Sequence, residues 1–122
     1  MATYIEINEV RYPASITGRL VDRDWDDRES KAIKLEMSYA DAIALFVDDI
    51  SWSIVQDIEE VTVEYDEEAG EMVSKTTTKY EYFDNSEYSI AGDVVDHRDG
   101  TVTVKMGKST AAELLAMLEE VL

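Results

Sequence analysis

Apolar and polar residues alternate through much of the chain, and this pattern predicts β-strands. Residues 31–37 place Ile33, Leu35 and Met37 on one side and mostly polar residues on the other, which is the two-residue period of a half-buried strand. Other segments rich in β-branched and aromatic residues predict strands at residues 3–7, 10–21, 52–65, 72–83, 88–96 and 101–106.

Short turns join these segments, so we expect hairpins and a mainly antiparallel sheet. The clearest turn signal is Asp99-Gly100, since a type I′ turn needs positive φ at both central positions. A two-residue turn there places Val95 opposite Val104.

Two segments change to helical spacing and predict amphipathic helices at about residues 38–48 and 110–122. Each opens with a pair spaced as a capping box, namely Ser38 with Asp41 and Thr110 with Glu113. The apolar stripe of the second helix comprises Leu114, Leu115, Leu118 and Val121. We expect such stripes to pack on the sheet.

Together these elements predict an α+β fold in one domain, residues 1–122: a mainly antiparallel sheet with long β-hairpins and two helices. The arms on either side of the turn at residues 66–71 carry few apolar residues at their far ends. We therefore expect an acidic β-ribbon, at about residues 57–83, to project from the body.

Composition excludes several classes of function. The 122 residues include 28 Asp or Glu, 11 Lys or Arg, one His and no Cys, for a formal charge of -17. Without Cys there is no thiolate zinc site, iron–sulfur cluster or cysteine nucleophile. A charge of this sign and size repels nucleic acid and anionic membranes.

The start of the chain, Met1 to Glu6, has neither a basic segment nor an apolar one, and no apolar stretch reaches the roughly 18 residues of a membrane span. We expect the protein in the cytoplasm of the cell that makes it.

One loop has the opening spacing of a calcium site, with carboxylates at Asp22, Asp24 and Asp26. The sixth position is Asp27 instead of Gly, and the twelfth is Ile33 instead of Glu. The loop therefore predicts a weak cation site at most, with a solvated loop as the favoured interpretation, and we expect no cofactor.

Large aromatic side chains are the candidate contact residues, because Trp and Tyr are enriched at protein interfaces. Trp25 stands among charged residues, where it either folds back as a plug on the body or anchors a partner. The full set of candidates is Trp25, Trp52, Tyr80, Tyr82 and Tyr88.

Residues 57–71 hold eight carboxylates and no base. Such a block usually marks a solvated surface. The sharper alternative is a negative face that imitates the phosphates of nucleic acid.

Four sets of residues are familiar together: Tyr12-Pro13 with residues 16–20, residues 24–31, residues 45–48 with 52–54, and residues 82–88 running into 91–102. They resemble a group of small, functionally uncharacterised proteins encoded in the tail-assembly regions of phages and prophages of Gram-positive bacteria. The resemblance implies a tail or baseplate context, with the protein in the cytoplasm of its bacterial host or on a virion, and brings no catalytic residue or cofactor.

We therefore expect a non-enzymatic phage or prophage structural or assembly protein that acts through protein–protein contacts. Edge strands on so small a sheet favour homo-oligomers. The alternative is an acidic decoy that inhibits a host DNA- or RNA-binding protein, and a cation-dependent enzyme or sensor ranks third.

Overall fold

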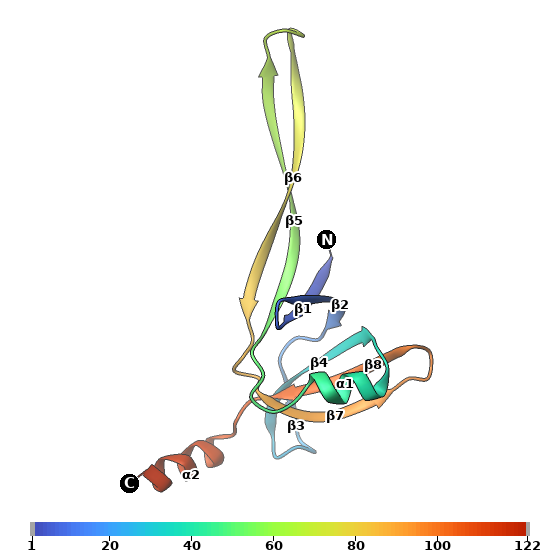
Figure 1. Ribbon diagram of the computed structural model, residues 1–122. Coiled ribbons are helices and arrows are strands. Elements are labelled where there is room, and N and C mark those ends of the chain that lie inside the picture. Colours follow the sequence, from blue (N-terminus) through green and yellow to red (C-terminus); the bar gives the residue numbers. More distant parts are fainter. Residues whose placement is uncertain (1, 122) are drawn as a thin grey trace.

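The structure, a computed structural model, describes residues 2–121 and has an antiparallel sheet with two helices (Figure 1). The strands are β1 (Thr3–Ile7), β2 (Val10–Ile16), β3 (Leu20–Asp22), β4 (Arg28–Glu36), β5 (Trp52–Asp66), β6 (Glu71–Asp84), β7 (Ile90–Asp96) and β8 (Thr101–Gly107). The helices are α1 (Tyr39–Leu45) and α2 (Ala111–Val121). This confirms the α+β class and the mainly antiparallel sheet. Leu122 and the side chain of Val121, both assigned to the second predicted helix, lie outside the described part.

All the strands belong to one sheet, in the order β6-β5-β1-β2-β4-β8-β7, with β3 paired to the first part of β4. Every pairing is antiparallel. The predicted strand at residues 10–21 is in fact two strands: β2 ends at Ile16, and residues 17–19 lead into β3. Both β2 and β3 pair with β4, at different parts of its length.

One face of this sheet carries the main hydrophobic core. Ile5 on β1, Ile33 on β4 and Val104 on β8 are fully buried and belong to one cluster, although their strands are spread across the sheet. The sheet must coil for these strands to share a core. The other buried members of the cluster are Ile7, Leu35, Ala42, Phe46, Trp52, Tyr88, Val102 and Met106.

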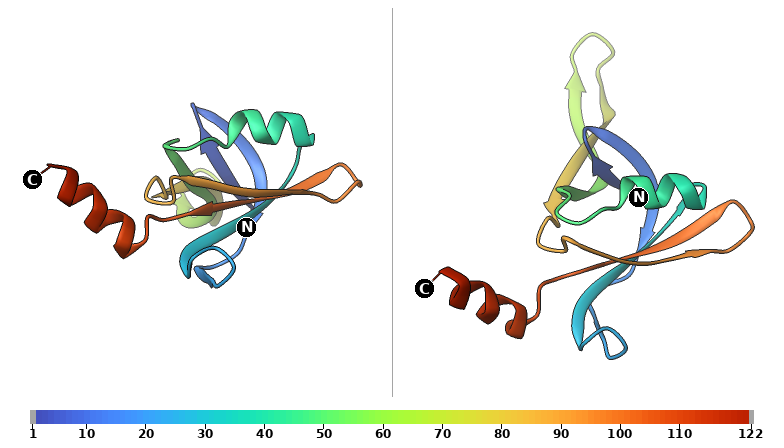
Figure 2. Two further views of the ribbon diagram at one scale, coloured as in Figure 1. Left: turned by 90° about the horizontal axis from the view of Figure 1, so that it is seen from below. Right: turned by 60° about the horizontal axis from the view of Figure 1, so that its bottom comes forward.

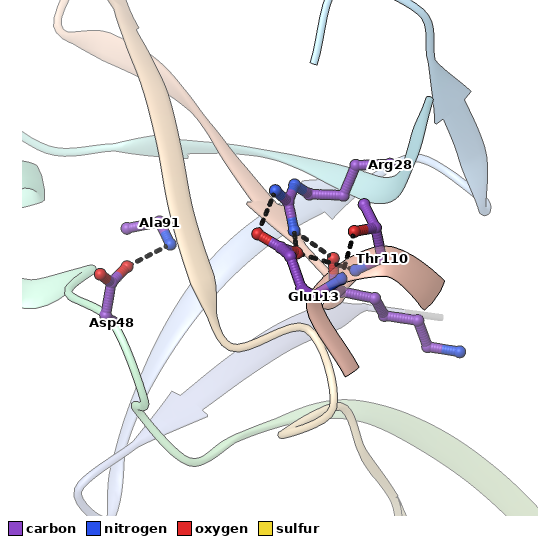
Figure 3. Close-up of polar contacts among 6 residues, drawn as sticks. Arg28, Asp48, Ala91, Thr110 and Glu113 are labelled. Atoms are coloured by element: carbon purple, nitrogen blue, oxygen red, sulfur yellow. Dashed lines mark hydrogen bonds and ion pairs between the residues drawn. The ribbon is translucent and has the colours of Figure 1, made fainter. Parts of the chain in front are cut away.

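Helix α1 lies over β7 and β8 and closes this core with Ala42 and the cap residue Phe46 (Figures 1 and 2). Its start is fixed by Ser38, whose hydroxyl accepts a hydrogen bond from the Asp41 N–H at 3.1 Å, as the capping pattern predicts. After the helix, the Asp48 carboxylate accepts a bond from the Ala91 N–H at 2.9 Å and ties the chain to β7 (Figure 3).

The opposite face of the sheet is closed locally by Trp25. Its ring lies over the backbone of Gly92, beside a bulge in β7, and of Gly107, at the end of β8. The guanidinium of Arg28, itself 4% exposed, stacks on the ring at 4.9 Å from its centre. Of the two alternatives for Trp25, a plug on the body or an anchor for a partner, the structure shows the plug.

The hairpin between β7 and β8 differs from the prediction by one residue of register. Val94, not Val95, lies opposite Val104, and the His97 N–H donates to the Thr101 carbonyl at 3.1 Å. Residues 97–100 therefore form a longer loop, with positive φ at Arg98 and Gly100. The prediction of a two-residue turn at Asp99-Gly100 is therefore wrong, because Arg98 and not Asp99 adopts the first left-handed conformation in the loop.

We predict that Gly107→Ala destabilises the fold by about 1–3 kcal/mol, the usual cost of overpacking. A Cβ there would lie 2.9 Å from the Trp25 ring and would also meet the buried Arg28 side chain. Urea denaturation measures the loss. Gly18→Ala is the matched control, since nothing lies within 4 Å of a Cβ at that position; equal stability of the two variants would contradict the plug.

Candidate protein interaction surfaces

The β5–β6 ribbon is the longest protrusion of the molecule (Figure 1). Strand β1 pairs with β5 only as far as Gln56, and two further bonds join Ala2 to Asp57: the Asp57 N–H donates to the Ala2 carbonyl at 3.1 Å, and the Ala2 N–H donates to the Asp57 carboxylate. Beyond this point β5 and β6 pair only with each other, up to the pair of Asp66 and Glu71. Beyond residue 57, β5 and β6 therefore form a two-stranded ribbon that extends from the body.

The ribbon has two different faces. Cross-strand pairs show that Val61, Val63 and Tyr65 of β5 share one face with Met72, Ser74 and Thr76 of β6. We call these six residues the apolar ribbon face. It bears no charge, and its four apolar side chains are 57–62% exposed.

The other face of the ribbon is charged. Lys79 pairs with Glu60 at 2.5 Å and Lys75 with Glu64 at 3.4 Å, all with side chains about half or more exposed. Such exposed pairs contribute little stability. They do, however, neutralise two of the eight carboxylates at residues 57–71.

The remaining carboxylates do not form one surface. Asp57 and Glu59 lie on the side of the apolar ribbon face, whereas Asp66 and Glu71 lie on the charged face. Glu67 and Glu68 are in the tip turn. The ribbon therefore does not form a strip of phosphate-like charges on one face.

At its base the ribbon carries Tyr80 and Tyr82, two of the predicted contact residues, which are 46% and 54% exposed. The Arg11 guanidinium from β2 stacks on both rings, 4.4 and 5.5 Å from their centres, and bonds to the Tyr82 hydroxyl. Strands β1 and β5 separate β2 from β6, so the Arg11 side chain reaches across the sheet to the two rings, on the face that also carries the fully buried Val55. Tyr80 and Tyr82 therefore help to cover this part of the sheet, and each keeps about half of its surface exposed to solvent.

Helix α2 is the second protrusion. It stands away from the body in all three views (Figures 1 and 2), and residues 111–120 are all exposed. Leu114, Leu115, Met117 and Leu118 are 51–61% exposed. The prediction that its stripe packs on the sheet is therefore wrong, and we call these four residues the apolar face of α2.

One ion pair fixes α2 to the body (Figure 3). Arg28 donates from Nη1 and Nη2 to the two Glu113 oxygens at 2.6 and 3.0 Å, and Nη1 also donates to the Lys108 carbonyl at 2.7 Å. Such a bidentate pair has a defined geometry. The Arg28 Nε is buried without a partner, so the guanidinium depends on Glu113 for much of its satisfaction.

Glu113 has a second role as the N-terminal cap partner. It accepts from the Thr110 N–H at 2.8 Å, and its own N–H donates to the Thr110 hydroxyl at 3.2 Å, which completes the predicted capping box. The Arg28 guanidinium and the Thr110 N–H lower the pKa of Glu113 from 4.5 to about 2.

Two of the predicted contact residues are in the core instead. Trp52 is 1% exposed and its Nε1 donates to the Tyr88 carbonyl at 2.9 Å, while Tyr88 is 2% exposed. Lys31 and Lys108 lie over the Tyr88 ring, 4.7 and 5.3 Å from its centre. Neither aromatic is free to contact a partner, because both are used to close the corner between β5 and β7.

The three aspartates of the loop are not gathered into a cation site. Asp22 binds the Lys105 ammonium, which lowers the pKa of its carboxyl, and it also accepts from the Asp24 N–H at 3.1 Å. Asp26 lies beyond, at positive φ. Within residues 2–121 no three His, Cys, Asp or Glu side chains are grouped so as to hold a metal ion.

No family model matches the chain, and no curated protein or solved structure is significantly similar to it. Over the described part of the chain, neither helix has the length and apolar character that crossing a membrane requires.

We predict that the Glu113 carboxyl titrates near pH 2 and that Arg28→Gln moves its pKa back toward 4.5. Because the pKa is lowered on folding, the stabilising effect of the pair is complete above pH 4.5 and is lost as the pH falls through about 2. Carboxyl-detected NMR titration measures it. Arg19→Gln, which removes a partner of Glu29 3.3 Å away, is the matched control and leaves the Glu113 pKa unchanged. A Glu113 midpoint near 4.5 in the unaltered chain would contradict the ion pair.

Proposed function

We propose that this chain is a non-enzymatic structural or assembly protein, encoded by a phage or prophage and associated with its tail or baseplate, that acts through protein–protein contacts. One observation carries the proposal: both arms that leave the body present an uncharged apolar face to solvent. These are the apolar ribbon face and the apolar face of α2.

Water-exposed apolar surface of this kind is unusual outside binding sites. Scattered apolar residues are normal on a protein surface, whereas contiguous patches mark interaction sites. Val61, Val63, Tyr65 and Met72 are adjacent on one face of two paired strands, so they form a patch and not a scatter.

The shape of the molecule supports a connecting role. The two arms point in different directions from the body (Figures 1 and 2), so a partner on the ribbon and a partner on α2 can be bound together. The resemblance to phage tail-assembly proteins supplies the context in which such a connector works, first in the host cytoplasm and then on the particle.

The decoy alternative has less support, because the carboxylates are divided between both ribbon faces and two of them pair with lysines. A decoy also makes the opposite prediction on salt, since charge-on-charge contacts weaken steeply as salt rises.

We predict that tail particles purified from cells producing them contain this chain in constant proportion, as quantified by mass spectrometry. Val63→Gln, on the apolar ribbon face, lowers its incorporation about tenfold or more, because loss of one central apolar contact costs at least about 1.4 kcal/mol. Val21→Gln is the matched control: Val21 is 65% exposed on β3, outside both arms, and its replacement has no effect. Infectious particles made without the chain would overturn the proposal.

A further inference from the structure

We propose that α2 binds a basic helical surface on a different protein: an apolar stripe with Lys or Arg at both of its ends. The inference rests on the proposed contact function and names the kind of partner that one arm takes. It begins with the apolar face of α2, whose side chains are 51–61% exposed. The body holds only the first turn of α2, through Glu113 and Thr110.

The apolar side of α2 points away from the body and begins at a cavity. With 3.6 residues per turn, Leu115 and Leu118 lie about 160° and 140° around the helix from Glu113, which is bound to the body. Ala111 is one turn before Leu115, on the same side, and it lines an open cavity of about 750 Å³ at the base of α2. One stripe therefore runs from this cavity to Leu118, about 10 Å along the helix.

The cavity at the base of the stripe is acidic. Its lining carries four carboxylates and two bases, namely Asp26, Asp27, Glu29, Glu113, Arg28 and Lys108. Both bases are already paired with carboxylates, Arg28 at 2.6 Å and Lys108 at 3.0 Å. Asp26 and Asp27 form no ion pair with any residue from 2 to 121. A base from a partner can therefore pair with them.

The far end of the stripe is acidic as well. Glu119 lies beside the stripe, about 100° around the helix from Leu118. Carboxylates in the last turn of a helix are unfavourable beside the negative end of its dipole, and α2 contains no base that could offset Glu119. A Lys or Arg from a partner at this end relieves that repulsion.

These charges define the partner, because complementary charge is what fixes partner choice at an interface. A second copy of the chain does not fit, since it presents the same carboxylates and a charge of -17. A membrane does not fit either, because helices that lie on membranes carry Lys and Arg on their polar face. The spacing of the stripe suits another helix, whose side-chain ridges pack into the grooves between these side chains.

The test uses three synthetic helical peptides of about 18 residues, or five turns. The first has a leucine stripe flanked by lysines, the second has glutamates in place of the lysines, and the third keeps the lysines but has glutamines in place of the leucines. Fluorescence anisotropy of the labelled peptides measures their binding to the full chain. The first peptide binds at least about tenfold more tightly than either of the others, and its binding weakens as salt rises.

An apolar substitution locates the contact on α2. Leu118→Gln weakens binding of the first peptide about tenfold or more. Val95→Gln is the matched control: Val95 is 51% exposed on β7, outside both arms, and its replacement leaves binding unchanged.

A charge substitution tests the two acidic ends. Asp27→Asn combined with Glu119→Gln weakens the first peptide severalfold, because each carboxylate loses a base. Neither change unfolds the site, since Asn tolerates the positive φ of Asp27 and loss of the Glu119 charge favours the helix. The matched control removes the same charge from the ribbon tip, by Glu67→Gln combined with Glu68→Gln, and has no effect.

Three results would overturn the basic partner: equal affinity of the first peptide and either of the others, equal weakening by the ribbon-tip variant, or weakening by Val63→Gln as large as that by Leu118→Gln. Failure of the proposed function is seen separately, because it is measured as particle incorporation. Incorporation that depends on Val63, together with no preference among the peptides, would retain the function and discard the basic partner of α2.

Discussion

The structure depends on one constraint: the main core lies on a single face of a single sheet. Strands as far apart in the sheet as β1 and β8 supply fully buried residues to one cluster, so the sheet has to coil, and α1 has only one side to close. Apolar burial is the main driving force for folding. Whatever extends beyond this coiled face, the ribbon and α2, receives little of that burial and keeps its own apolar residues in water.

The same constraint separates what could be predicted from the sequence from what could not. The strand at residues 31–37 and the capping pairs were predictable because the information is local. Where the apolar stripe from Leu114 to Leu118 packs could not be predicted, since an amphipathic helix has the same pattern whether it packs on its own sheet or on another molecule. Among the capping residues, Glu113 also makes a contact that could not be predicted, because its partner Arg28 lies 85 positions away in the sequence.

Among the candidate contact residues, aromatic type alone was a poor guide. Trp52 and Tyr88 are core residues, Trp25 is a plug, and Tyr80 and Tyr82 lie under Arg11. The informative signal was weaker: the alternation of Val61, Val63 and Tyr65, which continues past the point where any core could reach. This alternation marks an apolar surface that the body of the protein does not cover.

The free edges of the ribbon give its charge a different meaning. Past Asp57 both strands have unpaired backbone groups along their outer sides, and Thr-rich, Pro-free edges of this kind can recruit strands from neighbouring molecules into fibrils. Carboxylates at closely spaced positions on β5, and in the tip, make edge-to-edge stacking of identical ribbons repulsive. The negative charge of the ribbon then opposes polymerisation of the free chain through these edges.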